Sequence, residues 1–303
     1  MATQKPPADK PGMQPVTMLQ QPKKAPFPIT AIVNQITTRF LSVDHPGFQH
    51  TEEKYQARTP ASKAFYLIAY LLPGIIAYLL INVQPVYDFF VRISGLEGYH
   101  FQYYTFVIFS LLWHMLFPVF MLRKYEKLTW KEVFVFLSVD RFSFKEILLI
   151  APLAFGLSVI VSLPYMLTLY TPFQQWLSSI PLFQIPSYSI FASYEAFYGA
   201  PAIILILMMI GNFVGEEIYF RGYLMKKTAF LGRYNWIVNS TLFCVYHLWQ
   251  IPQTVPLMVP ILFFGLTMQL RKNLYTLIMF HLLFNLAGVQ IYQVILGLGT
   301  SAH

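Results

Sequence analysis

Two adjacent glutamates, Glu216 and Glu217, lie inside an otherwise apolar stretch of this chain, with Arg221 shortly after them. A charged carboxylate at membrane depth costs a few kcal/mol, so its presence there is by default a hypothesis of function. Two histidines, His247 and His281, lie in later apolar stretches. Acids and imidazoles buried in lipid-spanning helices indicate chemistry performed within the bilayer.

Helical spacing separates the roles of the two glutamates. Glu217 and Arg221 are four residues apart with the acid first, which is the favourable order for an ion pair on one helical face. Glu216 is turned about 100° away from Glu217 and has no basic residue one turn off. Asn212 lies one turn before Glu216 on the same face. We therefore predict that Glu217 is neutralised by Arg221 and that Glu216 remains free for chemistry.

The histidine segments show the same periodicity. Asn239, Phe243 and His247 recur at every fourth residue, and His281 and Asn285 form a second pair at this spacing. Each set presents its side chains from one helical face, as expected for residues that line an interior cavity. The sequence thus predicts that the polar members of both sets converge with the free glutamate. Phe243 is interpreted as a packing wall beside His247.

Two kinds of chemistry fit Glu216, His247, His281 and Asn285. A carboxylate next to a histidine can take a proton from water, and neutral His and Asn donors can stabilise a tetrahedral oxyanion. Alternatively, Glu216, His247 and His281 could bind a divalent ion such as zinc, in the His₂Glu pattern of catalytic zinc sites. The single cysteine, Cys244, excludes a Cys-based metal site. The sequence leaves both mechanisms open and the cofactor unknown.

Composition indicates what must position these residues. Hydrophobic residues make up 56% of the chain and charged residues 11%, whereas soluble domains carry about 25% charged residues. A helix that spans the bilayer needs about 20 apolar residues. We predict an all-α, polytopic transmembrane bundle of about seven to eight spans. The apolar stretches are 64–83, 102–122, 146–170, 200–221, 236–251, 256–270 and 274–296.

The basic residues predict the topology. When these spans are threaded from a cytoplasmic N-terminus, every Lys and Arg except Arg92 falls in the tail or in a cytoplasmic loop. The net charge of +8 is therefore a topological signal, and we predict no nucleic-acid partner. We divide the chain into a disordered cytoplasmic tail (1–28), an interfacial helix with a linker (29–62) and a transmembrane domain (63–298) that carries the polar residues.

Three ordered motifs carry a family resemblance. The sequence has Glu-Glu-x-x-x-Arg at 216–221, Phe-x-x-x-His at 243–247 and His-x-x-x-Asn at 281–285. Together they resemble the CPBP family, which includes the type II CAAX prenyl endopeptidases and bacteriocin-processing or immunity proteins. The resemblance implies an all-α intramembrane endopeptidase, and eight spans are typical of its eukaryotic members. It also implies that Glu216 and His247 activate water while His281 and Asn285 bind the oxyanion. Metal dependence is disputed in this family.

We accordingly predict a hydrolase that cleaves membrane-anchored or C-terminally modified (CAAX-like) peptides, with the bilayer and a peptide or prenylated protein as partners. We expect an integral protein of a bacterial-type plasma membrane. Two alternatives remain open: a proton- or metal-coupled transporter, because intramembrane Glu and His also build proton relays, and a non-catalytic immunity-type protein. His114, in the second span, has no motif partner and is interpreted as a hydrogen-bonded core histidine.

Overall fold

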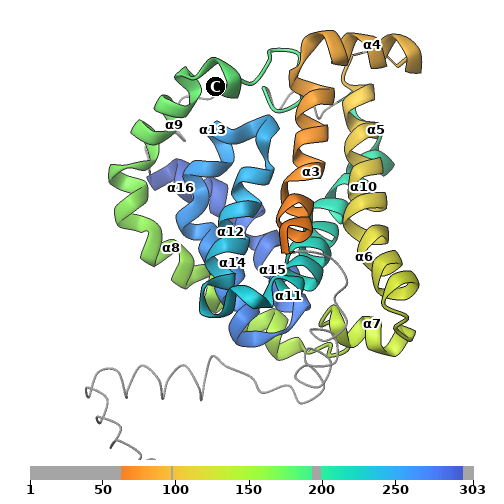
Figure 1. Cartoon of the computed structure of the whole chain (residues 1–303). Helices are drawn as coiled ribbons and strands as arrows, with labels where there is room; N and C mark the ends of the chain where they lie inside the picture. The colour runs from red at the N-terminus through yellow and green to blue at the C-terminus, as the bar shows by residue number, and fades with distance from the viewer. Residues whose placement is uncertain (1–62, 97, 193–198, 296–303) are drawn as a thin grey trace, which may run out of the picture. The chain divides into compact units, whose positions relative to one another are not determined.

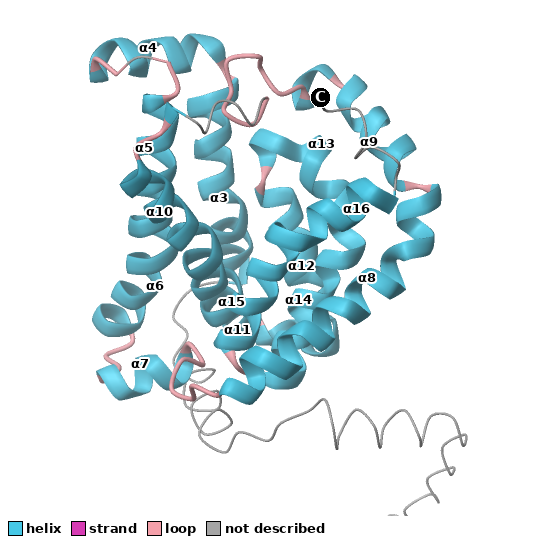
Figure 2. Ribbon diagram, turned by 180° about the vertical axis from the view of Figure 1, so that it is seen from behind, coloured by secondary structure: helices cyan, strands magenta, loops and turns pink. Residues whose placement is uncertain are grey.

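A computed structural model describes residues 63–96, 98–192 and 199–295 of the chain. The predicted tail (1–28) and the predicted interfacial helix and linker (29–62) lie outside these residues. Within the described ranges the regular secondary structure is helical, without strands, which confirms the predicted fold class (Figures 1 and 2).

Several of the long helices are continuous runs in which α-helical turns alternate with π-helical turns (η). In the first half of the chain the α- and π-helical elements are α3 (Lys63–Asn82), α4 (Gln84–Ser94), the run α5 (His100–Ile108), η2 (Phe109–Leu116), α6 (Phe117–Phe120) and η3 (Met121–Tyr125), then α7 (Trp130–Phe136), the run η4 (Glu146–Ile150) and α8 (Ala151–Thr168), and α9 (Tyr170–Ser179). The second half begins with the run α10 (Ala202–Ile210), η7 (Gly211–Gly215), η8 (Glu217–Leu224) and α11 (Met225–Lys227). It continues with α12 (Asn235–Tyr246), α13 (Ile251–Thr254), α14 (Met258–Arg271), and the run α15 (Leu274–Leu283), η12 (Phe284–Gly288) and α16 (Val289–Ile295).

Six helical runs of the described chain are long and apolar enough to cross a bilayer. They are Lys63–Asn82, His100–Tyr125, Glu146–Thr168, Ala202–Lys227, Leu248–Arg271 and Leu274–Tyr292.

The predicted span at 236–251 needs correction. Its helix, α12, has 12 residues and ends at Tyr246, which corresponds to about 18 Å of rise and is too short to cross the core alone. His247 leaves the helical conformation at φ −74° and ψ 49°. A helix continued past this point would bring the ring of Pro252 against the carbonyl group of Leu248. The chain instead turns back through α13 and the 3₁₀ helix Val255–Leu257. Pro252 and Pro256 occupy the first turns of these two helices, where no N–H is needed.

The returning helix α14 packs along α12, and α8, α15 and α3 contact this pair (Figure 1). Gly265 of α14 permits the close approach, because a Cβ at this position would lie 2.4 Å from the carbonyl oxygen of Trp236 in α12. A tight turn then joins α14 to α15. Lys272 ends α14 in the left-handed conformation, and the Asn273 side chain caps α15 by accepting hydrogen bonds from two backbone N–H groups. This turn places His281 beside α14.

Buried ion pairs connect the ends of these helices. Glu146, at the start of the third span, accepts hydrogen bonds from Arg271 at the end of α14, and Thr276 of α15 donates to the same carboxylate at 2.8 Å. Lys227, at the end of the fourth span, pairs with Glu126. Both pairs are at least nine-tenths buried at their side chains. Each connects elements distant in sequence and so limits the movement of the spans that carry the polar residues.

Candidate active site

Glu216 lies at the junction of η7 and η8, in the middle of the fourth span, and is 5% exposed. Two glycines one turn apart precede it and let the second span pack closely against this helix. A Cβ on Gly211 would lie 2.0 Å from the Ser110 Cβ, and one on Gly215 would lie 3.2 Å from the His114 Cβ. The carboxylate is therefore carried on a helix held in tight contact with its neighbour.

His247 is located immediately after the last residue of α12. Its Nδ1 lies 2.8 Å from the carbonyl oxygen of Phe243, in the last turn of that helix. A carbonyl can only accept, so Nδ1 carries the hydrogen and donates it, which satisfies a group that helix ends leave unpaired. The neutral imidazole consequently presents an unprotonated Nε2.

Nε2 of His247 faces Glu216, 3.6 Å from its Oε1. A carboxylate oxygen and an unprotonated imidazole nitrogen are both acceptors, so their close approach is favourable when one of the two groups carries a proton. The other carboxylate oxygen of Glu216 is buried and has no hydrogen-bond partner among the described residues. The two side chains thus form a unit that can take up a proton.

The second glutamate has a different environment. Oε1 of Glu217 accepts from Nη1 of Arg221 at 3.2 Å, and both side chains are fully buried. This confirms the ion pair predicted from the spacing. The same oxygen also accepts from Nδ1 of His281 at 2.9 Å. The first and third motifs are therefore joined through Glu217, a link that the sequence did not predict.

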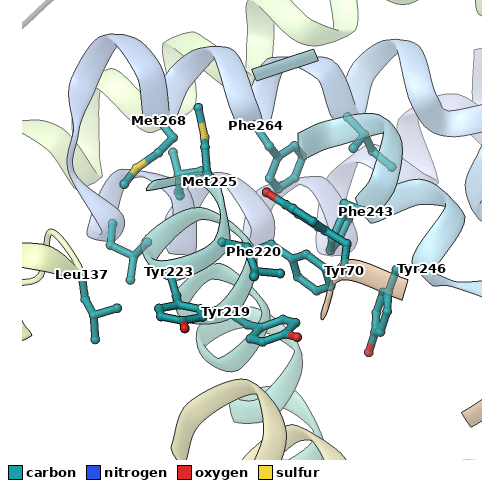
Figure 3. Packing of buried hydrophobic residues seen from close by; sticks show 14 of the residues in the cluster. Tyr70, Leu137, Tyr219, Phe220, Tyr223, Met225, Phe243, Tyr246, Phe264 and Met268 are labelled. Carbon is teal, nitrogen blue, oxygen red and sulfur yellow. The ribbon is translucent and has the colours of Figure 1, made fainter. Parts of the chain in front are cut away.

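Aromatic rings enclose the Arg221 guanidinium. Its central carbon lies 3.9 Å from the ring centroid of Phe243 and 5.1 Å from that of Phe264. Figure 3 shows Phe243 and Phe264 within the buried aromatic cluster, with Phe220 nearby. The Phe243 ring also stands edge-on to His247, with 4.8 Å between centroids. Phe243 is thus a wall beside the histidine, as predicted, and additionally a cation–π partner of Arg221.

Asn285 lies in η12, one turn after His281. Its Nδ2 donates to Oδ1 of Asn212 at 2.9 Å, and Asn212 precedes Glu216 by one turn. The sequence placed Asn212 on the face of Glu216 but did not predict this partner. One N–H of the Asn285 amide is therefore engaged, and Asn212 fixes the orientation of the other.

The predicted metal ligands do not form a set in this arrangement. Among the described residues, no three His, Cys, Asp or Glu side chains are grouped closely enough to hold a metal ion. Glu216 pairs with His247, whereas His281 is bound to Glu217 instead.

Residues 198–287 match the family model of the type II CAAX prenyl endopeptidase Rce1-like proteins. The chain carries an Rce1-like domain. This match confirms the resemblance drawn from the three motifs, and it covers every residue that they contain. No curated protein and no solved structure matched the chain.

The Rce1-like domain supports an intramembrane endopeptidase of the CAAX type in general. Such a protease is a hydrolase with a peptide substrate, and it is embedded in a membrane. The apolar helical runs agree with an integral membrane protein.

Proposed function

We propose that this protein hydrolyses peptide bonds near the C-termini of membrane-anchored, CAAX-like peptides, with Glu216 and His247 as the base that activates water. The observation that carries this proposal is the facing of the Glu216 carboxylate and the unprotonated His247 Nε2 across 3.6 Å, with one carboxylate oxygen unpartnered. Glu217, which is held by Arg221 and His281, has a structural role in this proposal and is not the base.

In the proposed reaction, the Glu216–His247 unit removes a proton from water while the water oxygen attacks the peptide carbonyl carbon. The resulting oxyanion accepts a hydrogen bond from the second N–H of the Asn285 amide. The C–N bond then breaks, and the leaving amine takes the proton that the unit holds. Water and peptide bond are converted to a carboxylic acid and an amine.

His281 is the second proposed oxyanion donor, with a condition set by its geometry. Since Nδ1 donates to Glu217, the neutral ring has no hydrogen on Nε2. The ring can donate from Nε2 only when it carries a second proton, and the adjacent carboxylate would compensate that charge. Asn285 needs no such change, so we assign it the larger part in binding the oxyanion.

The proposed membrane orientation follows from charge. Basic residues concentrate in the N-terminal tail and in alternate loops, which supports a cytoplasmic N-terminus and a site reached from the cytoplasmic half of the bilayer. Peptide C-termini on that side are the proposed substrates, and a bacterial-type plasma membrane is the proposed location.

A cleavage assay on purified protein in liposomes tests the proposal. Peptides ending in a CAAX sequence, with and without a farnesyl group on the cysteine, are incubated with wild type and Glu216→Gln, and products are identified by mass spectrometry. Loss of the base should lower kcat by about 10²–10⁴-fold. Glu132→Gln is the matched control, because glutamine preserves the capping box that Thr129 and Glu132 form in α7.

Each other outcome has a distinct meaning. Full activity of Glu216→Gln would contradict the proposed base. Glu216-dependent proton or metal flux across the liposomes without cleavage would favour a transporter, and neither activity would favour an immunity-type protein. Activity lost on chelation and restored by zinc would add a metal to the site.

A further inference from the structure

A third buried histidine lies next to the Glu216–His247 pair. His114, in η2 of the second span, is 2% exposed. With Ser110 one turn earlier, it packs against Gly211 and Gly215, and its Cβ would lie 3.2 Å from a Cβ on Gly215. His114 therefore contacts the residue immediately before Glu216.

The imidazole of His114 also reaches the element that carries His247. Its Nε2 lies 2.9 Å from the hydroxyl group of Tyr246, the residue immediately before His247. The Tyr246 ring packs against the His247 ring at 4.8 Å and against the Phe220 ring at 4.8 Å. The backbone of Tyr246 is held from the other side, where a Cβ on Gly74 would lie 2.0 Å from its carbonyl oxygen.

Packing stability alone does not explain a histidine at this position. The Nδ1 atom of His114 is buried and has no hydrogen-bond partner among the described residues. An unsatisfied polar atom in an apolar interior costs free energy, which an aliphatic side chain would avoid. His114 is also close enough to Glu216 and His247 to interact electrostatically with both. The feature that a polar ring supplies here is the hydrogen bond to Tyr246.

Building on the proposed function, we propose that His114 is a positioning residue which, through the Tyr246 hydroxyl, sets the separation of Glu216 and His247. It touches the residue before each of them and so spans the gap between two helices that carry the two halves of the base. The contacts of His114 with Gly215 and Tyr246 suffice for this role.

Kinetics of four variants test this role. His114→Leu and Tyr246→Phe each remove the hydrogen bond, and each should lower kcat by about 10–100-fold at nearly constant KM, because an ångström-scale displacement of a reacting group costs up to about 10²-fold. The double variant should be no slower than the slower single variant. His114→Gln, whose amide can still bond the tyrosine hydroxyl, should recover most of the activity.

Tyr292→Phe is the matched control. It removes another buried tyrosine hydroxyl bond of 2.9 Å, to Ser162, which connects α16 with α8. This variant should keep wild-type kinetics. Effects of His114→Leu and Tyr246→Phe that multiply in the double variant would overturn the inference, since the two residues would then act separately. If His114→Leu does not fold, Tyr246→Phe and His114→Gln decide the question.

A spectroscopic arm does not depend on turnover. The ring nitrogens of His247 are observed by NMR in ¹⁵N-histidine-labelled protein and assigned with His247→Gln. Their signals should shift in His114→Leu and in Tyr246→Phe, and stay in place in Tyr292→Phe. Unchanged His247 signals in both site variants would overturn the positioning role. If the wild type cleaves no peptide but the His247 signals still shift in the two site variants, the positioning role is supported while the proposed function fails.

Discussion

Glu217 and Arg221 allow a quantitative prediction about folding. Both side chains are fully buried, and their closest atoms are 3.2 Å apart. With an effective dielectric constant of about 20, two unit charges at this distance attract by about 5 kcal/mol. Removing one partner of a buried pair typically costs about 3–5 kcal/mol, because the other charge is left uncompensated. Glu217→Gln and Arg221→Met should each lower the free energy of unfolding by about that amount.

The double variant should recover much of this loss. A buried ion pair replaced by uncharged side chains of similar volume is often close to neutral in stability. Glutamine at position 217 can still accept the hydrogen bond from His281, and methionine at position 221 keeps an apolar stem between Phe243 and Phe264. Loss of the cation–π contact leaves a residual cost of about 2 kcal/mol.

The assay is reversible unfolding in mixed detergent and SDS micelles, followed by tryptophan fluorescence. Arg141→Met is the control, because Arg141 and Asp140 form an exposed pair at 3.8 Å and such pairs contribute about 1 kcal/mol or less. Single variants as stable as wild type would refute the reasoning. So would a double variant that loses the full sum of the two single effects, because the two charges would then not compensate each other.

Three further outcomes are expected. Asn285→Ala should lower kcat by about 10²–10³-fold while peptide binding, measured by fluorescence anisotropy, changes little, since an oxyanion exists only along the reaction path; equal losses in binding and kcat would contradict this role. Gly211→Ala should reduce folded yield in size-exclusion chromatography, because its Cβ would meet the Ser110 Cβ at 2.0 Å; a fully folded Gly211→Ala variant would show that the two spans can separate. Glu146→Ala should lower the unfolding free energy by about 3–5 kcal/mol, because it removes one partner of a buried ion pair and the acceptor of the Thr276 hydrogen bond, and an unchanged unfolding midpoint would contradict the importance of that pair.

Contacts and relative directions of side chains within one helix could be predicted from the sequence. The ion pair of Glu217 with Arg221 depends only on a spacing of four residues, and the structure confirms it. The separation of Glu216 from that pair depends on the same geometry. The order of the three motifs likewise sufficed to indicate the Rce1-like match at residues 198–287, since it does not depend on how the helices pack.

Hydrogen bonds between side chains of different helices could not be predicted in the same way. The spans are apolar on all sides, so periodicity does not indicate which face turns inward. The hydrogen bonds of His281 to Glu217 and of Asn285 to Asn212 depend on helix rotation and depth, and neither was predicted. His114 was interpreted as a hydrogen-bonded core residue. It is buried and hydrogen-bonded, but no motif or spacing indicated that its partner would be Tyr246.

The early end of α12 at Tyr246 bears on how water is supplied. Hydrolysis consumes one water molecule in every turnover, and the hydrocarbon interior of a bilayer provides none. Irregular backbone at membrane depth is tolerated only where protein or water surrounds it. The non-helical backbone at His247 and Gln250 lies about 18 Å along the rise of α12, and its N–H groups are satisfied by the protein itself, because His247 N–H donates to the Cys244 carbonyl and Gln250 N–H donates to the His247 carbonyl. The break therefore adds no unsatisfied N–H of these two residues to the interior, and the side chains of Glu216 and His247 are left to bind the water that the proposed hydrolysis would consume.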